Sequence, residues 1–266
     1  MSINNKLVKF ATQDLVLART AVERARITKS LDFLETSLRK HFDNRIDEVL
    51  KFGSYTRNTI LPRKYDTRSD VDLMVVFNTD NGVYNPETYR KWLSDFLKIR
   101  YPNSLSKKDL PSVKLELNHI MFDLVPSYVS NGFFTEHSYY IPKSNNTWMK
   151  TVPNDLNQDL QSLNQQIGNN SLRNAIRLCK YFNASSNFPF SSYEFEKEIL
   201  SYCDWNSFNN ENTFQLFFMI MNSLTRNIPE AKLALKHIKK YDGNFFTEKD
   251  EVKQLLWLGR LLPGVK

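Results

Sequence analysis

Three aspartates occur inside segments whose other residues are typical of buried strands. Asp70 and Asp72 begin the run DVDLMVVF, and Asp123 lies in HIMFDLVPSY. Because side chains alternate along a strand, Asp70 and Asp72 share one face. Carboxylates placed side by side repel, and burial disfavours their charged forms, so bound divalent cations are the usual compensation. We therefore predict that these three aspartates hold a pair of metal ions about 3.5–4 Å apart, which clamp the attacking and leaving oxygens of an in-line displacement.

A Gly-Ser pair precedes the aspartates and could supply the other half of such a site. Gly53 and Ser54 follow a predicted short strand at residues 48–52. Glycine allows a phosphate to approach the backbone closely, and a serine hydroxyl with nearby N–H groups can hold phosphate oxygens. A Gly-Ser pair or an Asp-x-Asp pair alone is common in ordinary turns. The combination favours a catalytic site because the motifs follow one another in a fixed order. A strand leads into the Gly-Ser pair, a second strand begins with the Asp-x-Asp pair, and a later strand carries the third aspartate.

The sequence predicts the sheet that must position these residues. The clearest strand is Val71–Phe77, which is β-branched and almost continuously hydrophobic. Residues 112–128 read as two strands that turn near Asn118. A long helix is expected from Thr12 to about Lys40, and another helix at residues 86–99.

From about Pro153 onward the pattern becomes helical. Asn-rich and Pro-containing connectors separate six segments of helical length, at 154–168, 171–184, 192–202, 212–226, 229–241 and 247–262. We therefore expect an α+β fold with two domains. Residues 1–150 would form a mixed sheet with flanking helices and a long N-terminal spine helix, and residues 151–266 a helical lobe that closes the active-site cleft.

Composition narrows the class of protein. Lys and Arg outnumber Asp and Glu by 36 to 29, and the formal net charge of +7 favours anionic partners such as nucleotides or nucleic acid. The two cysteines exclude a disulfide framework and a Cys-based zinc site. No apolar run approaches the roughly 20 residues of a membrane span, and the N-terminus lacks the apolar stretch of a secretory signal. We expect a cytoplasmic protein that does not bind membranes.

A family resemblance follows from these motifs. The segment FGSYTRNTILPRKYDTRSDVDLMVVF resembles the signature of DNA-polymerase-β-type nucleotidyltransferases, whose core pattern is Gly-Ser, a loop and Asp-x-Asp. More narrowly, the chain is similar to the bacterial CD-NTases, cyclic-oligonucleotide synthases related to animal cyclic GMP-AMP synthase and oligoadenylate synthase. Three features support that branch: the spacing from Gly53 to Thr59, the strand FDLVPSY, and LRNAIRLCKYF followed by SSYEFE.

The resemblance implies a polymerase-β-like core that depends on Mg²⁺, with Mn²⁺ as an alternative ion. It assigns Asp70, Asp72 and Asp123 to the metal ions, and it gives Asp123 a further role in activating the acceptor hydroxyl. The intact acidic triad also argues against a non-catalytic nucleotide-binding module, because a scaffold would have no reason to bear the repulsion among these carboxylates.

The resemblance also implies which residues bind the nucleotide. Thr59, Lys180 and Ser192 would join the Gly-Ser pair in holding it, with Lys180 and Ser192 on the triphosphate. Independently, Arg173, Arg177 and Lys180 fall at i, i+4 and i+7, a basic stripe on one face of the predicted helix.

The implied product is a cyclic di- or oligonucleotide made from NTPs such as ATP and GTP, with UTP and CTP as further candidates. The implied setting is antiphage signalling through a nucleotide-activated effector. Two alternatives stay open: template-independent addition of nucleotides to RNA or tRNA 3′ ends or to a protein hydroxyl, and the non-catalytic nucleotide-binding module. A nucleic-acid partner fits the basic balance but is not required.

Overall fold

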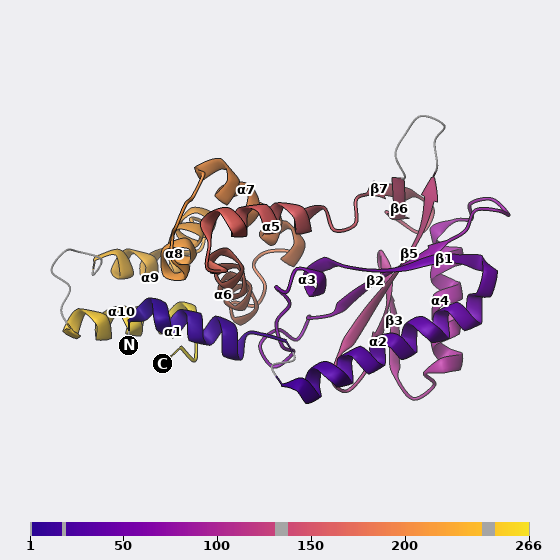
Figure 1. Cartoon of the computed structure of the whole chain (residues 1–266), viewed down its shortest axis with the longest axis horizontal. Helices are drawn as coiled ribbons and strands as arrows, with labels where there is room; N and C mark the ends of the chain where they lie inside the picture. The colour runs from indigo at the N-terminus through magenta and orange to yellow at the C-terminus, as the bar shows by residue number, and fades with distance from the viewer. Residues whose placement is uncertain (1, 18–19, 131–137, 241–247, 266) are drawn as a thin grey trace. The chain divides into compact units, whose positions relative to one another are not determined.

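The computed structural model describes residues 2–17, 20–130, 138–240 and 248–265 (Figure 1). The chain divides into two compact units, each made of segments that are separated in sequence. The helical unit comprises Met1–Leu17, Asn58–Arg68 and Leu156–Lys266. The sheet unit comprises Ala18–Arg57 and Ser69–Asp155.

The sheet unit contains a 7-stranded mixed sheet with the order β1-β2-β5-β4-β3, in which β6 pairs with β5 and β7 pairs with β6. Only the β2–β5 pair is parallel among these described strands. The strands are β1 (Ile46–Phe52), β2 (Val71–Phe77), β3 (Leu105–Asp109), β4 (Ser112–Glu116), β5 (Met121–Ser130), β6 (Ser138–Pro142) and β7 (Trp148–Thr151).

Helices α2 (Ala21–Phe42) and α4 (Pro86–Arg100) lie beside this sheet (Figure 1). Phe77 of β2 faces them, because its ring lies 5.2 Å from that of Phe42 in α2 and 4.9 Å from that of Tyr89 in α4. Side chains alternate along β2, so its even-numbered residues, including Asp72, point to the opposite face. On that face a small buried cluster forms from Met74, Val76, Val125 and Ile141.

The N-terminal part of the chain differs from the prediction, because residues 12–40 do not form one helix. Helix α2 begins at Ala21, and Thr20 caps it. The Thr20 hydroxyl accepts a hydrogen bond from the Glu23 backbone N–H (3.1 Å), and the Glu23 carboxylate accepts one from the Thr20 N–H (3.0 Å). This reciprocal capping box starts the helix there. Leu15, which lies within the helix predicted from Thr12 to about Lys40, is instead buried in the core of the helical unit.

All six helices predicted after Pro153 are present, with ends that differ by a few residues. The predicted ends at 241 and 247 lie outside the described residues. They share one hydrophobic core with the N-terminal turns of the chain. The elements of this unit are α1 (Ile3–Lys9), the π-helical turn η1 (Phe10–Asp14), α5 (Asp155–Ile167), α6 (Ser171–Ser185), α7 (Ser192–Asn206), α8 (Thr213–Leu224), α9 (Pro229–Lys240) and α10 (Glu248–Leu261).

The strands carrying the candidate site match the prediction, whereas β3, β6 and β7 were not predicted. The predicted strand at Val71–Phe77 has the observed bounds of β2, and the predicted pair within residues 112–128 is β4 and β5. Over the part of the chain that the structure describes, no helix is both long and apolar enough to cross a bilayer.

Candidate active site

Asp72 and Asp123 are direct neighbours in the sheet. The two residues lie opposite each other in the register of the parallel pair β2–β5. Adjacent strands run about 4.8 Å apart, and residues in register on parallel strands point to the same face. Asp70 comes two residues before Asp72, immediately ahead of β2. The fold therefore brings the three predicted carboxylates to one end of one face of the sheet.

Gly53 lies directly against the Asp72 carboxylate. Its φ is +74°, in the left-handed region, and a Cβ built at this position would stand 2.0 Å from Asp72 Oδ2. Both facts require glycine, because any side chain would strain the backbone and displace the carboxylate. The following residues, Gly53–Thr56, form the short helical turn α3, which carries Ser54. The Gly-Ser turn and the Asp-x-Asp strand are therefore in close contact, as their order in the sequence had suggested.

Asn154 anchors this turn, and the sequence analysis did not identify it. Its Nδ2 donates to the Lys51 carbonyl (3.2 Å), and its Oδ1 lies 3.0 Å from the Thr56 hydroxyl. The same hydroxyl is 2.8 Å from the Gly53 carbonyl. Asn154 adopts a left-handed φ of 64°, which asparagine tolerates better than most residues. An asparagine beside a proline could have been read as a turn, but the pattern gives no sign that it contacts a turn about a hundred residues earlier.

Lys114 is the second residue that the sequence analysis missed. It lies opposite Asp123 in the antiparallel pair β4–β5, and so on the same face of the sheet. Its Nζ is 3.8 Å from Asp70 Oδ2 and 3.2 Å from Asp109 Oδ2. Burial lowers the pKa of Lys114, but the negative charges of Asp123, Asp109 and Asp70 outweigh burial and leave this pKa above its ordinary value.

The environment of Asp123 raises the pKa of its carboxyl group. Burial raises the pKa of the Asp123 carboxyl, the hydrogen bond with the Ser112 side chain and the charge of Lys114 lower it, and Asp109 raises it again; the net direction is upward. The Oδ1 atom is shielded from solvent and, within the described structure, has no hydrogen-bond partner. A buried acceptor of this kind is costly unless something ligates it.

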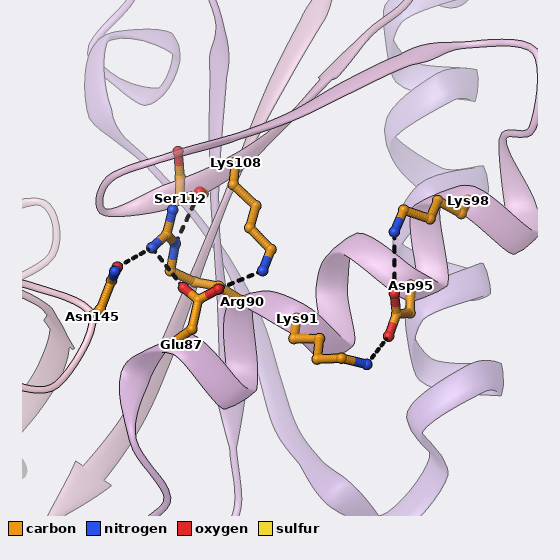
Figure 2. Close-up of polar contacts among 8 residues, drawn as sticks. All are labelled: Glu87, Arg90, Lys91, Asp95, Lys98, Lys108, Ser112 and Asn145. Carbon is orange, nitrogen blue, oxygen red and sulfur yellow. Dashed lines mark hydrogen bonds and ion pairs between the residues drawn. The ribbon is translucent and has the colours of Figure 1, made fainter.

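A polar network around Arg90 fixes the start of β4 (Figure 2). Arg90 of α4, which is almost fully buried, donates from Nε to the Ser112 carbonyl (3.4 Å) and from Nη1 to Glu87 (3.0 Å) and Asn145 (2.9 Å). Lys108 of β3 pairs with the same Glu87 carboxylate. Because β4 pairs with β5, this network supports the strand beside the one that carries Asp123.

The carboxylates suit a divalent cation, although their side chains are not gathered around one. Across the described segments, no group of three or more His, Cys, Asp or Glu side chains is placed to hold a metal ion. Asp72 lies against Gly53, and Asp70 Oδ2 lies 3.8 Å from Lys114 Nζ. The donor set still fits, because carboxylate oxygens are the ligands that Mg²⁺ prefers. The unpartnered Oδ1 of Asp123 is the atom that a cation would satisfy.

The remaining predicted residues belong to the helical unit. Lys180 of α6 and Glu196 of α7 are both buried, and Lys180 Nζ lies 3.8 Å from Glu196 Oε2. Thr59, which is fully buried, donates from its hydroxyl to Glu196 Oε1 (2.7 Å). Ser192 is the first residue of α7 and is exposed. The structure therefore brings Thr59 and Lys180 together around Glu196, which was not predicted as a site residue.

The basic stripe predicted on α6 is not a solvated face. Arg177 is buried, and its guanidinium donates to the Asn58 carbonyl from Nε (3.0 Å) and from Nη2 (2.8 Å). Burial lowers the pKa of Arg177 to about 10, and the nearby charge of Arg173 acts in the same direction. Arg177 therefore fixes the backbone just before Thr59.

Comparison with protein families gives the context for this geometry. Residues 1–164 match the SMODS family, described as the Second Messenger Oligonucleotide or Dinucleotide Synthetase domain. The chain belongs to the SMODS family. This SMODS chain is 26% identical over 201 residues to a probable cyclic nucleotide synthase of Bacillus cereus strain VD146. The aligned region covers 62% of this chain and 59% of that relative, so the match spans less than two thirds of the relative's length.

Solved structures share the fold of this SMODS chain. CdnC of E. coli MS115-1, solved with ATP, matches with a TM-score of 0.71 and 14% identity, over 100% of this chain and 98% of that chain. CdnE of Elizabethkingia meningoseptica, a cyclic dinucleotide synthase solved with GTP and Apcpp, matches with a TM-score of 0.61 and 16% identity, over 98% of both chains. These likenesses confirm the predicted α+β nucleotidyltransferase fold. The resemblance to CD-NTases is confirmed at the level of the family.

Proposed function

We propose that this protein is a Mg²⁺-dependent nucleotidyltransferase that makes a cyclic di- or oligonucleotide from NTPs. The observation that carries the proposal is the register of Asp72 opposite Asp123, with Gly53 in contact with the Asp72 carboxylate. Membership of the SMODS family supports the same activity. Mn²⁺ would substitute for Mg²⁺ at the same carboxylates.

We assign the metal ions to Asp70, Asp72 and Asp123. Bound divalent ions would neutralise the triphosphate and polarise its α-phosphate. In the transfer step, a ribose hydroxyl oxygen forms a bond to the α-phosphorus while the bond from that phosphorus to the β-phosphate oxygen breaks. Pyrophosphate leaves, and the proton of the hydroxyl passes to Asp123. A second transfer within the linear product closes the ring.

The other predicted residues bind the nucleotide. In this proposal, Gly53 lets the phosphates approach the backbone, and the Ser54 hydroxyl donates a hydrogen bond to a phosphate oxygen. Lys180 and Ser192 act on the β- and γ-phosphates, where a positive charge favours departure of pyrophosphate. Because Thr59 is fully buried against Glu196, its contribution to nucleotide binding would pass through the position of Lys180.

The biological setting is also a proposal. A cyclic nucleotide made in the cytoplasm would activate a separate effector, and the family resemblance suggests antiphage defence as the purpose. ATP and GTP are the first substrates to test, because CdnC was solved with ATP and CdnE with GTP. UTP and CTP belong in the same assay.

The test is mass spectrometry of products made from all four NTPs with Mg²⁺, before and after phosphatase treatment. We expect phosphatase-resistant cyclic products from the native protein and none from the Asp70→Asn/Asp72→Asn variant. Asp80→Asn is the matched control, because Asp80 is an exposed aspartate shortly after β2 ends, and it should leave the products unchanged. Linear products alone, turnover that requires added RNA or protein, or full activity of the double variant would each contradict the proposal.

A further inference from the structure

Two acidic residues and two basic residues form one row across the sheet. Reading from β2 to β3, the residues in register are Asp72, Asp123, Lys114 and Lys107. Directly opposed residues on neighbouring strands share a face and place their Cβ atoms about 4.5–5.5 Å apart. Lys114 thus lies beside the carboxylates that we assign to divalent cations. Its backbone position is fixed by the pairing of β4 with β5.

The contacts of Lys114 distinguish it from an ordinary surface lysine. Its ammonium lies between a proposed metal ligand, Asp70 at 3.8 Å, and a residue outside the proposed metal set, Asp109 at 3.2 Å. The Lys114 side chain is 30% exposed, so its charge is only partly screened. Lys107 on the adjacent strand has the same charge but is exposed.

Charge balance explains why a cation belongs at this position. Without a bound metal, Asp70, Asp72 and Asp123 would repel one another, and Lys114 offsets part of that repulsion. With a metal bound, an ammonium at the same carboxylates would oppose the incoming charge. Asp109 supplies a second partner, so Lys114 can stay paired after the metal takes Asp70. The long flexible stem of lysine allows such an exchange, which a short or rigid side chain would not.

We propose that Lys114 is a positioning residue that serves as an internal counter-ion of the acidic site, holding the carboxylates in the metal-free protein and competing with the metal for them. This inference rests on the proposed function, because it takes Asp70, Asp72 and Asp123 to be the metal ligands. It predicts that Lys114 lowers the affinity for metal while stabilising the metal-free protein.

The experiment measures Mn²⁺ binding, from the paramagnetic resonance signal of the free ion, and thermal unfolding in EDTA. The proteins are the native chain, Lys114→Met, Lys114→Arg, Lys107→Met and Asp70→Asn/Asp72→Asn. We expect Lys114→Met to bind Mn²⁺ about tenfold more tightly, because the substitution removes a positive charge beside the bound cation in a partly exposed site. Its melting temperature in EDTA should fall by about 2–4 °C, and saturating Mn²⁺ should recover that loss.

The controls separate charge from packing. Lys114→Arg keeps the charge and should restore both native values, and Lys107→Met should change neither. Unchanged or weaker Mn²⁺ binding by Lys114→Met would overturn the role of Lys114, as would a fall in melting temperature that Mn²⁺ does not recover. If the native protein binds Mn²⁺ and Asp70→Asn/Asp72→Asn does not, such a result would overturn only the role of Lys114 and would leave the proposed metal site standing. If Mn²⁺ binds none of the proteins, or binds the double variant normally, the proposed metal site itself is wrong and the inference falls with it.

Discussion

The hydroxyl of Thr59 donates a 2.7 Å hydrogen bond to Glu196, and both side chains are buried. The other carboxylate oxygen of Glu196 lies 3.8 Å from the ammonium of Lys180. Glu196 thereby ties the segment after the Gly-Ser turn to α6 and α7, and it compensates a buried positive charge. A buried ammonium without such a partner would be strongly disfavoured.

Glu196→Gln should destabilise the protein. The amide oxygen can still accept from Thr59, but the charge facing Lys180 is lost, which should cost about 3 kcal/mol because a buried ion pair then lacks one partner. Urea unfolding measures the change. Glu198→Gln on the exposed side of α7 is the matched control and should stay within about 0.5 kcal/mol. If Glu196→Gln were as stable as the native chain, Glu196 would not be compensating the charge of Lys180. If Glu196 does compensate that charge, Lys180→Met/Glu196→Gln should be more stable than Glu196→Gln alone.

Gly53→Ala should abolish nucleotide transfer with the fold retained. The new Cβ would lie 2.0 Å from Asp72 Oδ2, so the carboxylate must move from its place beside Asp123. We expect at least a hundredfold loss of turnover, or about 2.7 kcal/mol in the barrier. Gly82→Ala imposes a similar backbone penalty, at a φ of +83°, in open space. Product formation by both variants should therefore separate the steric clash from the strain, and equal activities would show that the clash with Asp72 does not impair transfer.

The elements whose burial follows a simple pattern along the chain could be predicted from the sequence. Val71–Phe77 is buried at nearly every position, and its bounds were predicted correctly. Leu105–Asp109 was missed because every residue of this edge strand is exposed, so its hydrophobic pattern is absent and only pairing with β4 makes it a strand. The start of α2 was predicted at Thr12, too early in the chain, because the capping box at Thr20 decides the boundary.

In the candidate site, too, only some of the residues could be predicted from the sequence pattern. Asp70, Asp72 and Asp123 could be predicted because carboxylates are conspicuous in apolar strands. Lys114 and Asn154 could not, because periodicity shows which way a side chain points but not which strand or turn lies beside it. The positions of both residues follow from tertiary pairing, Lys114 from the register of β4 with β5 and Asn154 from its bond to the Lys51 carbonyl.

Both cysteines should be unreactive in the folded protein. Burial raises the pKa of Cys203 to about 12, with Glu211 acting in the same direction, and burial also raises the pKa of Cys179. A raised pKa lowers the fraction of reactive thiolate, so moving from pH 7 to pH 9 should barely speed labelling by a disulfide reagent, whereas the unfolded chain should react faster across that range. With the native protein, the reagent should release almost no coloured thiolate product. With the denatured protein, it should detect two thiols. Rapid labelling of the native chain would show that at least one thiol is accessible.

Asn154→Gly should weaken catalysis without unfolding the sheet unit. Glycine adopts the left-handed φ of 64° easily, so the substitution removes only the side chain that bonds the Lys51 carbonyl and lies beside the Thr56 hydroxyl. The Gly-Ser turn then loses an anchor, and a small misplacement of phosphate-binding groups should lower kcat by about tenfold or more.

Asn169→Gly is the control for this change, because it replaces another left-handed asparagine, with φ of 52°, in the connection between α5 and α6. Steady-state kinetics on NTPs, with circular dichroism to check folding, compare the two variants. A fall in kcat confined to Asn154→Gly would indicate that the anchor preorganises the turn. An equal fall in both would instead point to a general loss of backbone rigidity, since the only feature they share is the change from asparagine to glycine at positive φ.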